Sequence, residues 1–221
     1  MFHLSVSEEI KTKCPNFRGA AVYARVVNSQ HNDLLWEEID NFTSTLKATG
    51  TLEGIKMNTV IAATRKAYKA CGKDPSRYRV SAEALQRRII RGLDLYQIDT
   101  LVDIINLVSL RTGYSIGGFD ADKIQGNDIT LGIGKTGEPY EGIGRGELNI
   151  EGMPVYRDLA GGIGTPTSDN ERTKMDLNTQ HILAVINGYN GQEGLKEAAE
   201  MITDLLRKYA GSSLETVIYF E

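Results

Sequence analysis

The sequence has few of the residues from which metal sites and disulfide frameworks are built. Its 221 residues include only two cysteines, Cys14 and Cys71, and three histidines, His3, His31 and His181. Neither cysteine has a nearby cysteine partner, and no two histidines form a His-x-x-x-His pair. This spacing argues against zinc knuckles and histidine-rich metal centres, while a disulfide between the distant cysteines stays open. We expect no metal and no cofactor.

Long apolar runs are also absent. The runs at 60–63 and 182–186 are far shorter than the roughly 20 residues that a membrane-spanning helix needs. The first five residues lack the cationic region and following apolar stretch of a signal peptide. We therefore expect a cytoplasmic protein with no membrane association.

Negative charge predominates, but only slightly, and the basic residues are unevenly distributed. The net charge of −4 by itself argues against a simple basic nucleic-acid binder. Between Lys56 and Gly92, however, ten basic residues face two acids, which gives this segment +8 and leaves −12 for the rest. The asymmetry indicates either an anion-binding face or an ordinary solvated surface with cations at helix ends.

Hydrophobic residues make up 41% of the chain and charged residues 24%, as in a packed globular protein. The length and the absence of a Pro- or Ser-rich linker favour one domain over residues 1–221. Periodicity and capping residues predict helices, and alternation or short apolar runs predict strands. The expected helices run from Asn32 or Asp33 to Gly50, from Asn58 to Gly72, from Ser81 to Gly92, from Asp99 to Gly113, and over 195–211.

Expected strands lie at 2–6, 20–27, 182–186 and 215–220, with several short ones between 114 and 170. Helices and strands are segregated rather than alternating, which predicts an α+β fold. The glycine pattern at 132–138 is echoed at 142–147 and suggests successive hairpins. Gly134-Lys135-Thr136 matches the end of a phosphate-binding loop, but Ile129 stands where that motif needs glycine, so a hairpin turn is expected.

Two further motif tests concern catalysis. No Gly-x-Ser-x-Gly elbow is present, so an ordinary serine hydrolase has no local support. The densest polar stretch is 165–174, which combines hydroxyls, carboxylates and cations. This composition is typical either of a solvated loop or of part of a binding site.

A series of motifs then points to a known family. Leu101-Val102-Asp103-Ile104-Ile105-Asn106 is followed by Gly113-x-x-Ile116-Gly117-Gly118-Phe119-Asp120, by Lys123-Ile124-Gln125-Gly126, by Gly137-Glu138 and by Thr179-Gln180-His181-Ile182-Leu183. In this order the motifs resemble the tRNA-editing module of the phenylalanyl-tRNA synthetase beta chain, the B-three/B-four module. Upstream, Ser81-x-Glu83-x-Leu85-x-Arg87-Arg88 with Gly92 resembles free-standing members of the family. The resemblance covers about residues 60–190.

The resemblance implies an α+β fold with a β-sandwich-like core and flanking helices. It also implies a pocket that admits a wrongly attached amino acid, typically tyrosine on the phenylalanine tRNA, and hydrolyses the ester. Asn106 and Asp120 match the family pattern. The family's pocket histidine aligns with Gly117, and its acidic residue after the Ile-Leu run falls at Val185.

From polarity and resemblance we predict three groups of functional residues, with tRNA or aminoacyl-tRNA as the partner. The catalytic candidates are Asn106, Asp169 and Glu171, where Asn106 fixes the substrate and the acids orient water. The pocket candidates are Gly117, Gly118, Asp120, Gly162, Arg172, Thr173 and Lys174, where Arg172 or Lys174 holds a terminal phosphate. The RNA-binding candidates are Arg65, Lys69, Arg87, Arg88 and Arg91.

Two alternatives remain at this stage. The chain could be a non-catalytic RNA-binding module, since the basic helices are present and the family's histidine is not; binding should then fall steeply with salt. It could instead be an amino-acid-binding protein or small-molecule hydrolase that uses the same pocket. Thermal stabilisation by free tyrosine or phenylalanine without RNA binding would favour this second alternative.

Overall fold

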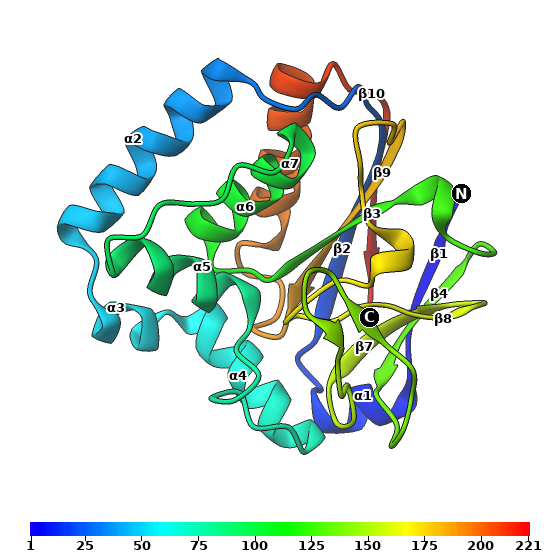
Figure 1. The fold of residues 1–221 in the computed structure, drawn as a ribbon. Coiled ribbons are helices and arrows are strands. Elements are labelled where there is room, and N and C mark those ends of the chain that lie inside the picture. The colour runs from blue at the N-terminus through cyan, green and yellow to red at the C-terminus, as the bar shows by residue number, and fades with distance from the viewer.

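Two four-stranded sheets and a layer of helices form the computed structural model, which describes residues 1–221 (Figure 1). The first sheet has the order β1–β4–β7–β8, and the second has the order β10–β2–β9–β3. The strands are β1 (His3–Val6), β2 (Arg18–Arg25), β3 (Ile116–Asp120), β4 (Asp128–Ile133), β5 (Glu141–Gly142), β6 (Gly146–Glu147), β7 (Pro154–Asp158), β8 (Gly161–Gly164), β9 (His181–Gly188) and β10 (Ser213–Phe220).

The helices lie mainly on one side of the second sheet. They are α1 (Glu8–Lys13), α2 (Asp33–Thr49), α3 (Leu52–Met57), α4 (Thr59–Cys71), α5 (Ser81–Ile90), α6 (Thr100–Thr112) and α7 (Leu195–Ala210), with short 3-10 helices η1 (Ala121–Lys123) and η2 (Glu171–Thr173). In Figure 1, α6 and α7 lie beside the second sheet and α2 lies outside them. No helix is long and apolar enough to cross a membrane.

The core divides into layers because side chains alternate along each strand. In β9, Leu183 and Val185 belong to a cluster between the two sheets, which also takes residues of β1, β4 and β7. Ile182, Ala184 and Ile186 point the other way and belong to the cluster formed with α2, α6 and α7. This arrangement confirms the predicted α+β fold with a β-sandwich-like core and flanking helices. One domain over 1–221 stays a prediction.

Local capping signals identified three helices correctly. Asn32, Asn58 and Asp99 each accept a backbone N–H of the first turn with a side-chain oxygen, at 3.0 Å in each case. Such caps satisfy donors that have no partner within the helix. The helices end at Gly50, Gly72 and Gly113 as predicted, and the last two of these adopt positive φ.

Four other details differ from the predictions. The six-residue helices α1 and α3 were not anticipated, because they are too short to show a helical period. Val80, not Ser81, occupies the cap position of α5, which ends at Ile90 rather than Gly92. Of the two echoed glycine segments, only the second forms a hairpin, β5–β6. The first is a turn after β4, closed by the Lys135 N–H to the Glu138 carboxylate at 2.8 Å.

Candidate functional site

The glycine-rich strand β3 is the edge of the second sheet, and the polar loop 165–174 covers its free side. β3 pairs with β9 on one side only. On the other side the N–H of Gly118 donates to Oδ2 of Asp169 at 3.0 Å, and Phe119 forms an isolated bridge with Lys174. The loop therefore meets the backbone donors that an edge strand leaves unpaired.

Asp169 occupies space that two glycines leave free. A Cβ atom at Gly117 would lie 2.7 Å from the Phe119 ring and 3.3 Å from Oδ1 of Asp169. At Gly164 in β8 a Cβ atom would lie 2.5 Å from the same ring and 2.9 Å from the same oxygen. The carboxylate thus lies between β3 and β8, where the two sheets meet at one side of the sandwich.

Gly117 pairs with Val185 across β3 and β9. These are the positions at which the sequence resemblance places the family's histidine and acid. Val185 is fully buried between the sheets, and the Phe119 ring leaves no room for a side chain at Gly117. The carboxylate that lies against Gly117 comes from the loop, at Asp169.

The pKa of Asp169 is raised from 3.8 to about 7, because burial disfavours the charged form. The hydrogen bond from Gly118 lowers it only in part, and no Lys or Arg forms an ion pair with this carboxylate. A carboxyl group that titrates near neutral pH can both take and return a proton during a reaction.

Asn106 lies on α6, which packs against β3. Its side chain is half-buried and forms no hydrogen bond within the protein, so the amide is free to bind another molecule. The preceding residue, Ile105, lies 3.5 Å from the position of a Cβ at Gly118, and the Met175 methyl lies 2.7 Å from it. Ile105 and Met175 therefore fill the space over Gly118, and Asn106 is the next residue along α6.

Several predicted pocket residues hold the loop and strand in place. Arg172 donates to both oxygens of the buried Asp158, at 3.0 and 2.7 Å. Asp120 accepts from the Thr179 hydroxyl at 2.9 Å. Gly162 packs under the Tyr140 ring, which would lie 2.8 Å from a Cβ there. These interactions explain how the polar stretch keeps one conformation.

Two other predicted residues, Glu171 and Lys174, pair with each other at the surface. Lys174 Nζ lies 2.5 Å from Oε2 of Glu171, whose other oxygen accepts from the Gly144 N–H at 3.2 Å. Thr173, between them, is buried, and its hydroxyl has no hydrogen-bond partner.

Two tyrosines that the sequence analysis did not identify anchor the same loop. Tyr140 donates to the Ser168 carbonyl at 2.7 Å, and the Tyr68 and Thr167 hydroxyls lie 2.8 Å apart. The partners are 28 and 99 positions apart in sequence, so no local motif could have indicated them. They brace the segment that carries Asp169.

In the basic segment 56–92, some cations are paired with an acid and others are not. Glu83 is buried with a side chain only 3% exposed, and it accepts from Arg65 at 2.7 Å and from Arg87 at 2.8 Å, with Arg79 at 3.6 Å. Arg88 stacks on the exposed Tyr96 ring, with its guanidinium carbon 3.8 Å from the ring centroid. Lys69 and Arg91 are exposed and form no ion pair in the structure.

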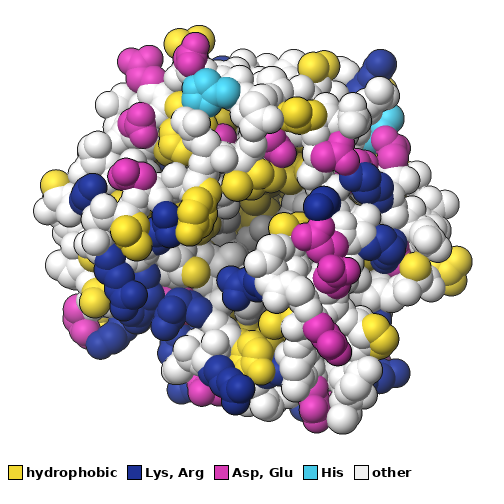
Figure 2. Space-filling model, viewed as in Figure 1, with side chains coloured by type: hydrophobic (Ala, Val, Ile, Leu, Met, Phe, Trp, Pro, Cys, Tyr) yellow, Lys and Arg dark blue, Asp and Glu magenta, His cyan; other side chains and the backbone are white.

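Figure 2 shows that this face of the molecule is hollowed at its centre. The hollow separates the helical side of the molecule from the side of the β5–β6 hairpin. Lys and Arg side chains gather at its lower left, over the region of α3 to α5. The basic helices therefore border the hollowed face.

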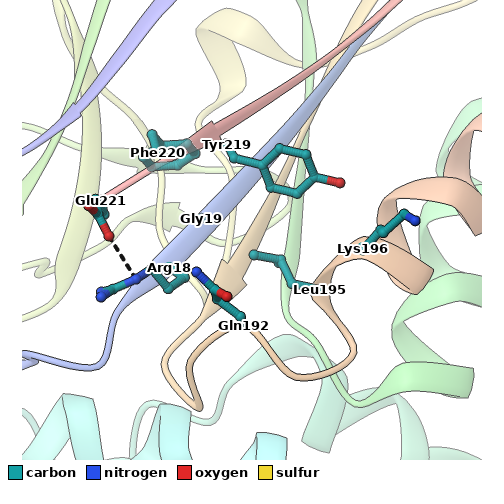
Figure 3. A pocket seen from close by; sticks show the side chains of 8 residues that line it. All are labelled: Arg18, Gly19, Gln192, Leu195, Lys196, Tyr219, Phe220 and Glu221. Carbon is teal, nitrogen blue, oxygen red and sulfur yellow. Dashed lines mark ion pairs between the residues drawn. The ribbon is translucent and has the colours of Figure 1, made fainter.

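A separate cavity of about 520 Å³ lies between the start of β2, the loop before α7 and the end of β10 (Figure 3). It is lined by Tyr219, Gln192 and Leu195, and the Arg18–Glu221 ion pair closes one side at 2.8 Å. None of the predicted site residues lines it. Its charged groups are the Arg18–Glu221 ion pair and Lys196, and no carboxylate in it is both buried and without a cation, as Asp169 is at the β3 edge.

Comparisons with known proteins agree with this architecture. The family model described as the B3/4 domain matches residues 63–211. Among solved structures, the chain is similar to an N-terminal fragment of the phenylalanyl-tRNA synthetase beta-subunit from Pyrococcus horikoshii, with 15% identity and a TM-score of 0.51. That alignment covers 99% of this chain and 50% of the fragment, so the chain spans about half of the fragment's length. No curated protein matches the sequence.

Proposed function

The chain belongs to the B3/4 domain family, and on this premise we propose that it binds the aminoacylated end of a tRNA and hydrolyses a wrongly attached amino acid. One observation carries the proposal. Asp169, whose pKa is raised to about 7, lies against the outer edge of β3 in a loop that Tyr68 and Tyr140 anchor.

The proposed reaction needs little beyond positioning and one proton transfer. An aminoacyl ester is already activated, so a bound water that attacks its carbonyl carbon is the main requirement. Ionised Asp169 accepts a proton from this water as the new C–O bond forms. The protonated carboxyl then gives the proton to the ribose oxygen that leaves, and the products are the free amino acid and the tRNA.

The neighbouring residues have binding and positioning roles in this proposal. The free amide of Asn106 binds the amino-acid or ribose end of the substrate, and Glu171 helps to orient water. Gly117 and Gly118 bring no side chain of their own to β3, which lets Asp169 and Met175 pack against the strand, and the substrate binds beside them. Arg172 holds the loop through Asp158. Lys174, at the surface, exchanges its partner Glu171 for a terminal phosphate.

The exposed cations on the helical side bind the tRNA backbone. Lys69 and Arg91 are free to contact phosphates, and the Arg88–Tyr96 stack offers a flat surface to an unpaired base. Arg65 and Arg87 contribute through the positive charge that remains after pairing with Glu83, which is three guanidiniums against one carboxylate.

The test is a deacylation assay with a panel of misacylated tRNAs, tyrosine on the phenylalanine tRNA first. We expect kcat/KM to rise with pH and to level off above an apparent pKa of about 7. Asp169→Asn should lower the rate about 100- to 10,000-fold, since it removes the proton acceptor. The exposed Asp128→Asn serves as the matched control and should leave the rate unchanged. No acceleration over the uncatalysed rate with any substrate would refute the hydrolytic proposal.

A second candidate is a non-catalytic tRNA-binding module. It is favoured by Gly117 and Val185, which stand where the family has its histidine and acid. In that case binding should weaken steeply with salt, and deacylation should be absent with every substrate. Measurements of deacylation and of salt-dependent tRNA binding on the same protein therefore distinguish the two candidates.

A further inference from the structure

The only two cysteines of the chain meet in the fold, although they are 57 positions apart. Cys14 follows α1, Cys71 is the last residue of α4, and these helices pack together. Both belong to the hydrophobic cluster between the sheets, and both are free thiols. The thiols lie close enough for each to shift the pKa of the other, and Lys13 lines a surface cavity with each of them.

Each cysteine is also among the residues that line a surface cavity. Cys71 lines a cavity of about 620 Å³ together with Lys73 and Lys135. Cys14 lines a second cavity of about 290 Å³ together with Lys66. Lys13 lines both. Both side chains are buried, and these cavities are the routes by which a small oxidant reaches them.

The surroundings of the two thiols favour Cys14 as the nucleophile and keep the proton on Cys71. The hydrogen bond from Cys71 lowers the pKa of Cys14, and Lys13 lowers it further. The same hydrogen bond, with burial, raises the pKa of Cys71 far above its usual range. Because the thiolate is the reactive form, positive charge beside one member of a pair is typical of redox-active cysteines.

We propose that Cys14 and Cys71 are a redox modification site, a reversible dithiol that a peroxide converts to a disulfide between α1 and α4. The Cys14 thiolate attacks one peroxide oxygen, the O–O bond breaks, and the leaving oxygen takes a proton and departs as water or an alcohol. Cys14 is then a sulfenic acid. The Cys71 sulfur attacks the Cys14 sulfur, the S–O bond breaks, and the Cys71 proton leaves with the hydroxide as water. Two thiols are oxidised by two electrons, and the peroxide is reduced by two.

The disulfide would stabilise the fold, because it closes a 58-residue segment of the unfolded chain. The loop-closure effect for such a segment corresponds to a rise of about 5–15 °C in Tm for a protein of this size. The reduced and oxidised proteins are therefore distinguishable by thermal unfolding as well as by mass.

The experiment exposes the full chain to hydrogen peroxide, then unfolds it and alkylates the remaining thiols. We expect the wild-type protein to lose both alkylatable thiols and two hydrogen atoms in mass, with a Cys14–Cys71 linked peptide in the digest. Dithiothreitol should restore both thiols and return Tm to its reduced value.

The single variants separate the two roles. In Cys71→Ser, Cys14 should form a sulfenic acid that dimedone traps, because the resolving thiol is missing. In Cys14→Ser, Cys71 should remain alkylatable. If a variant does not fold, the loss of both thiols in the wild-type protein still tests whether peroxide forms the Cys14–Cys71 disulfide.

Two alkylatable thiols after exposure would overturn the proposal, and so would a disulfide found only between two chains. The redox site is independent of the proposed hydrolysis, since its readouts are thiol content, mass and Tm. Its failure would leave the deacylation assay unaffected.

Discussion

Two carboxylates are withdrawn from solvent in different parts of the molecule, and they are stabilised in opposite ways. Glu83, between α4 and α5, is surrounded by the guanidiniums of three arginines. Asp169, at the edge of β3, has one backbone N–H and no cation. The first arrangement secures a permanent negative charge, because nearby cations offset the cost of removing it from water. The second leaves the proton on Asp169 exchangeable near neutral pH.

The two carboxylates therefore differ in role: Glu83 stabilises the fold, whereas Asp169 can transfer a proton. The region around Glu83 uses its charges to join two helices, and the positive charge left after this pairing is smaller than the number of arginines suggests. The region around Asp169 has little net charge, yet it holds the group that can transfer a proton. A substitution in either region should therefore affect the one without the other.

The largest effect is expected from Asp169→Asn, as a pH-dependent difference in stability. The folded protein keeps the Asp169 proton up to about pH 7, whereas the unfolded chain releases it near 3.8. The contribution of Asp169 to stability therefore falls as pH rises between these values and is constant above them. Asparagine has no such proton, so the variant should gain about 2–4 kcal/mol relative to wild type between pH 4 and pH 8. Urea unfolding at both pH values measures this gain.

Asp103 provides an internal check on that measurement. Burial raises its pKa to about 6, so it contributes a fall in stability over the same range. The wild-type protein and the Asp169→Asn variant share this contribution, and it cancels in their difference. A difference that stays constant from pH 4 to pH 8 would show that Asp169 does not titrate as described.

The next effect concerns Glu83→Gln, which leaves three arginines without their carboxylate. We expect a loss of about 2–3 kcal/mol, toward the lower end for a broken buried pair, because Arg65 and Arg87 are still partly exposed. Urea unfolding at pH 7 measures it, with the exposed Glu53→Gln as the control. Equal stability of the two variants would mean that Glu83 does not join the helices.

A smaller effect is expected from alanine at the two glycines of the β3 edge. Gly117→Ala should cost about 1–2 kcal/mol, because its Cβ meets the ring of the fully buried Phe119. Gly118→Ala should cost less, since its Cβ meets the end of the flexible Met175 side chain. Thermal unfolding of both variants gives the comparison, and a greater loss for Gly118→Ala would contradict the described packing.

The smallest change in stability is expected from Lys69→Glu and Arg91→Glu, within about 0.5 kcal/mol, since both side chains are exposed and unpaired. Their tRNA affinity should fall, and the slope of log affinity against log salt should decrease by about one for each phosphate that the variant no longer neutralises. Filter binding at several salt concentrations measures this. Unchanged binding in the double variant would remove these cations from the proposed tRNA face.

The sequence predicted those features that depend on residues close together in the chain. Asn58 and Asp99 cap helices through N–H groups two or three positions away, so the pattern was visible. Residues of the polar stretch 165–174 were also singled out by composition, Asp169 among them. The site residues themselves stay predictions, since only their placement is now known.

Features that depend on distant residues could not be predicted. The bond between Asp169 and Gly118 joins positions 51 apart, and Glu83 meets Arg65 across 18 positions. Charge counting therefore treated Arg65 and Arg87 as free cations, although a buried acid holds both. Likewise, the two cysteines had no sequence spacing that indicated contact, and only the packing of α1 against α4 brings them together.

The position of β2 has a consequence for how the protein is made. This apolar strand is complete at Arg25, but its two neighbours are β9, which ends at Gly188, and β10, which ends at Phe220. A ribosome that adds 5–20 residues per second needs roughly 10–30 s to reach the end of β9. Throughout that interval β2 has neither of its partner strands, so the nascent chain exposes an unpaired hydrophobic strand. A longer lifetime of this intermediate is expected to lower the yield of native protein.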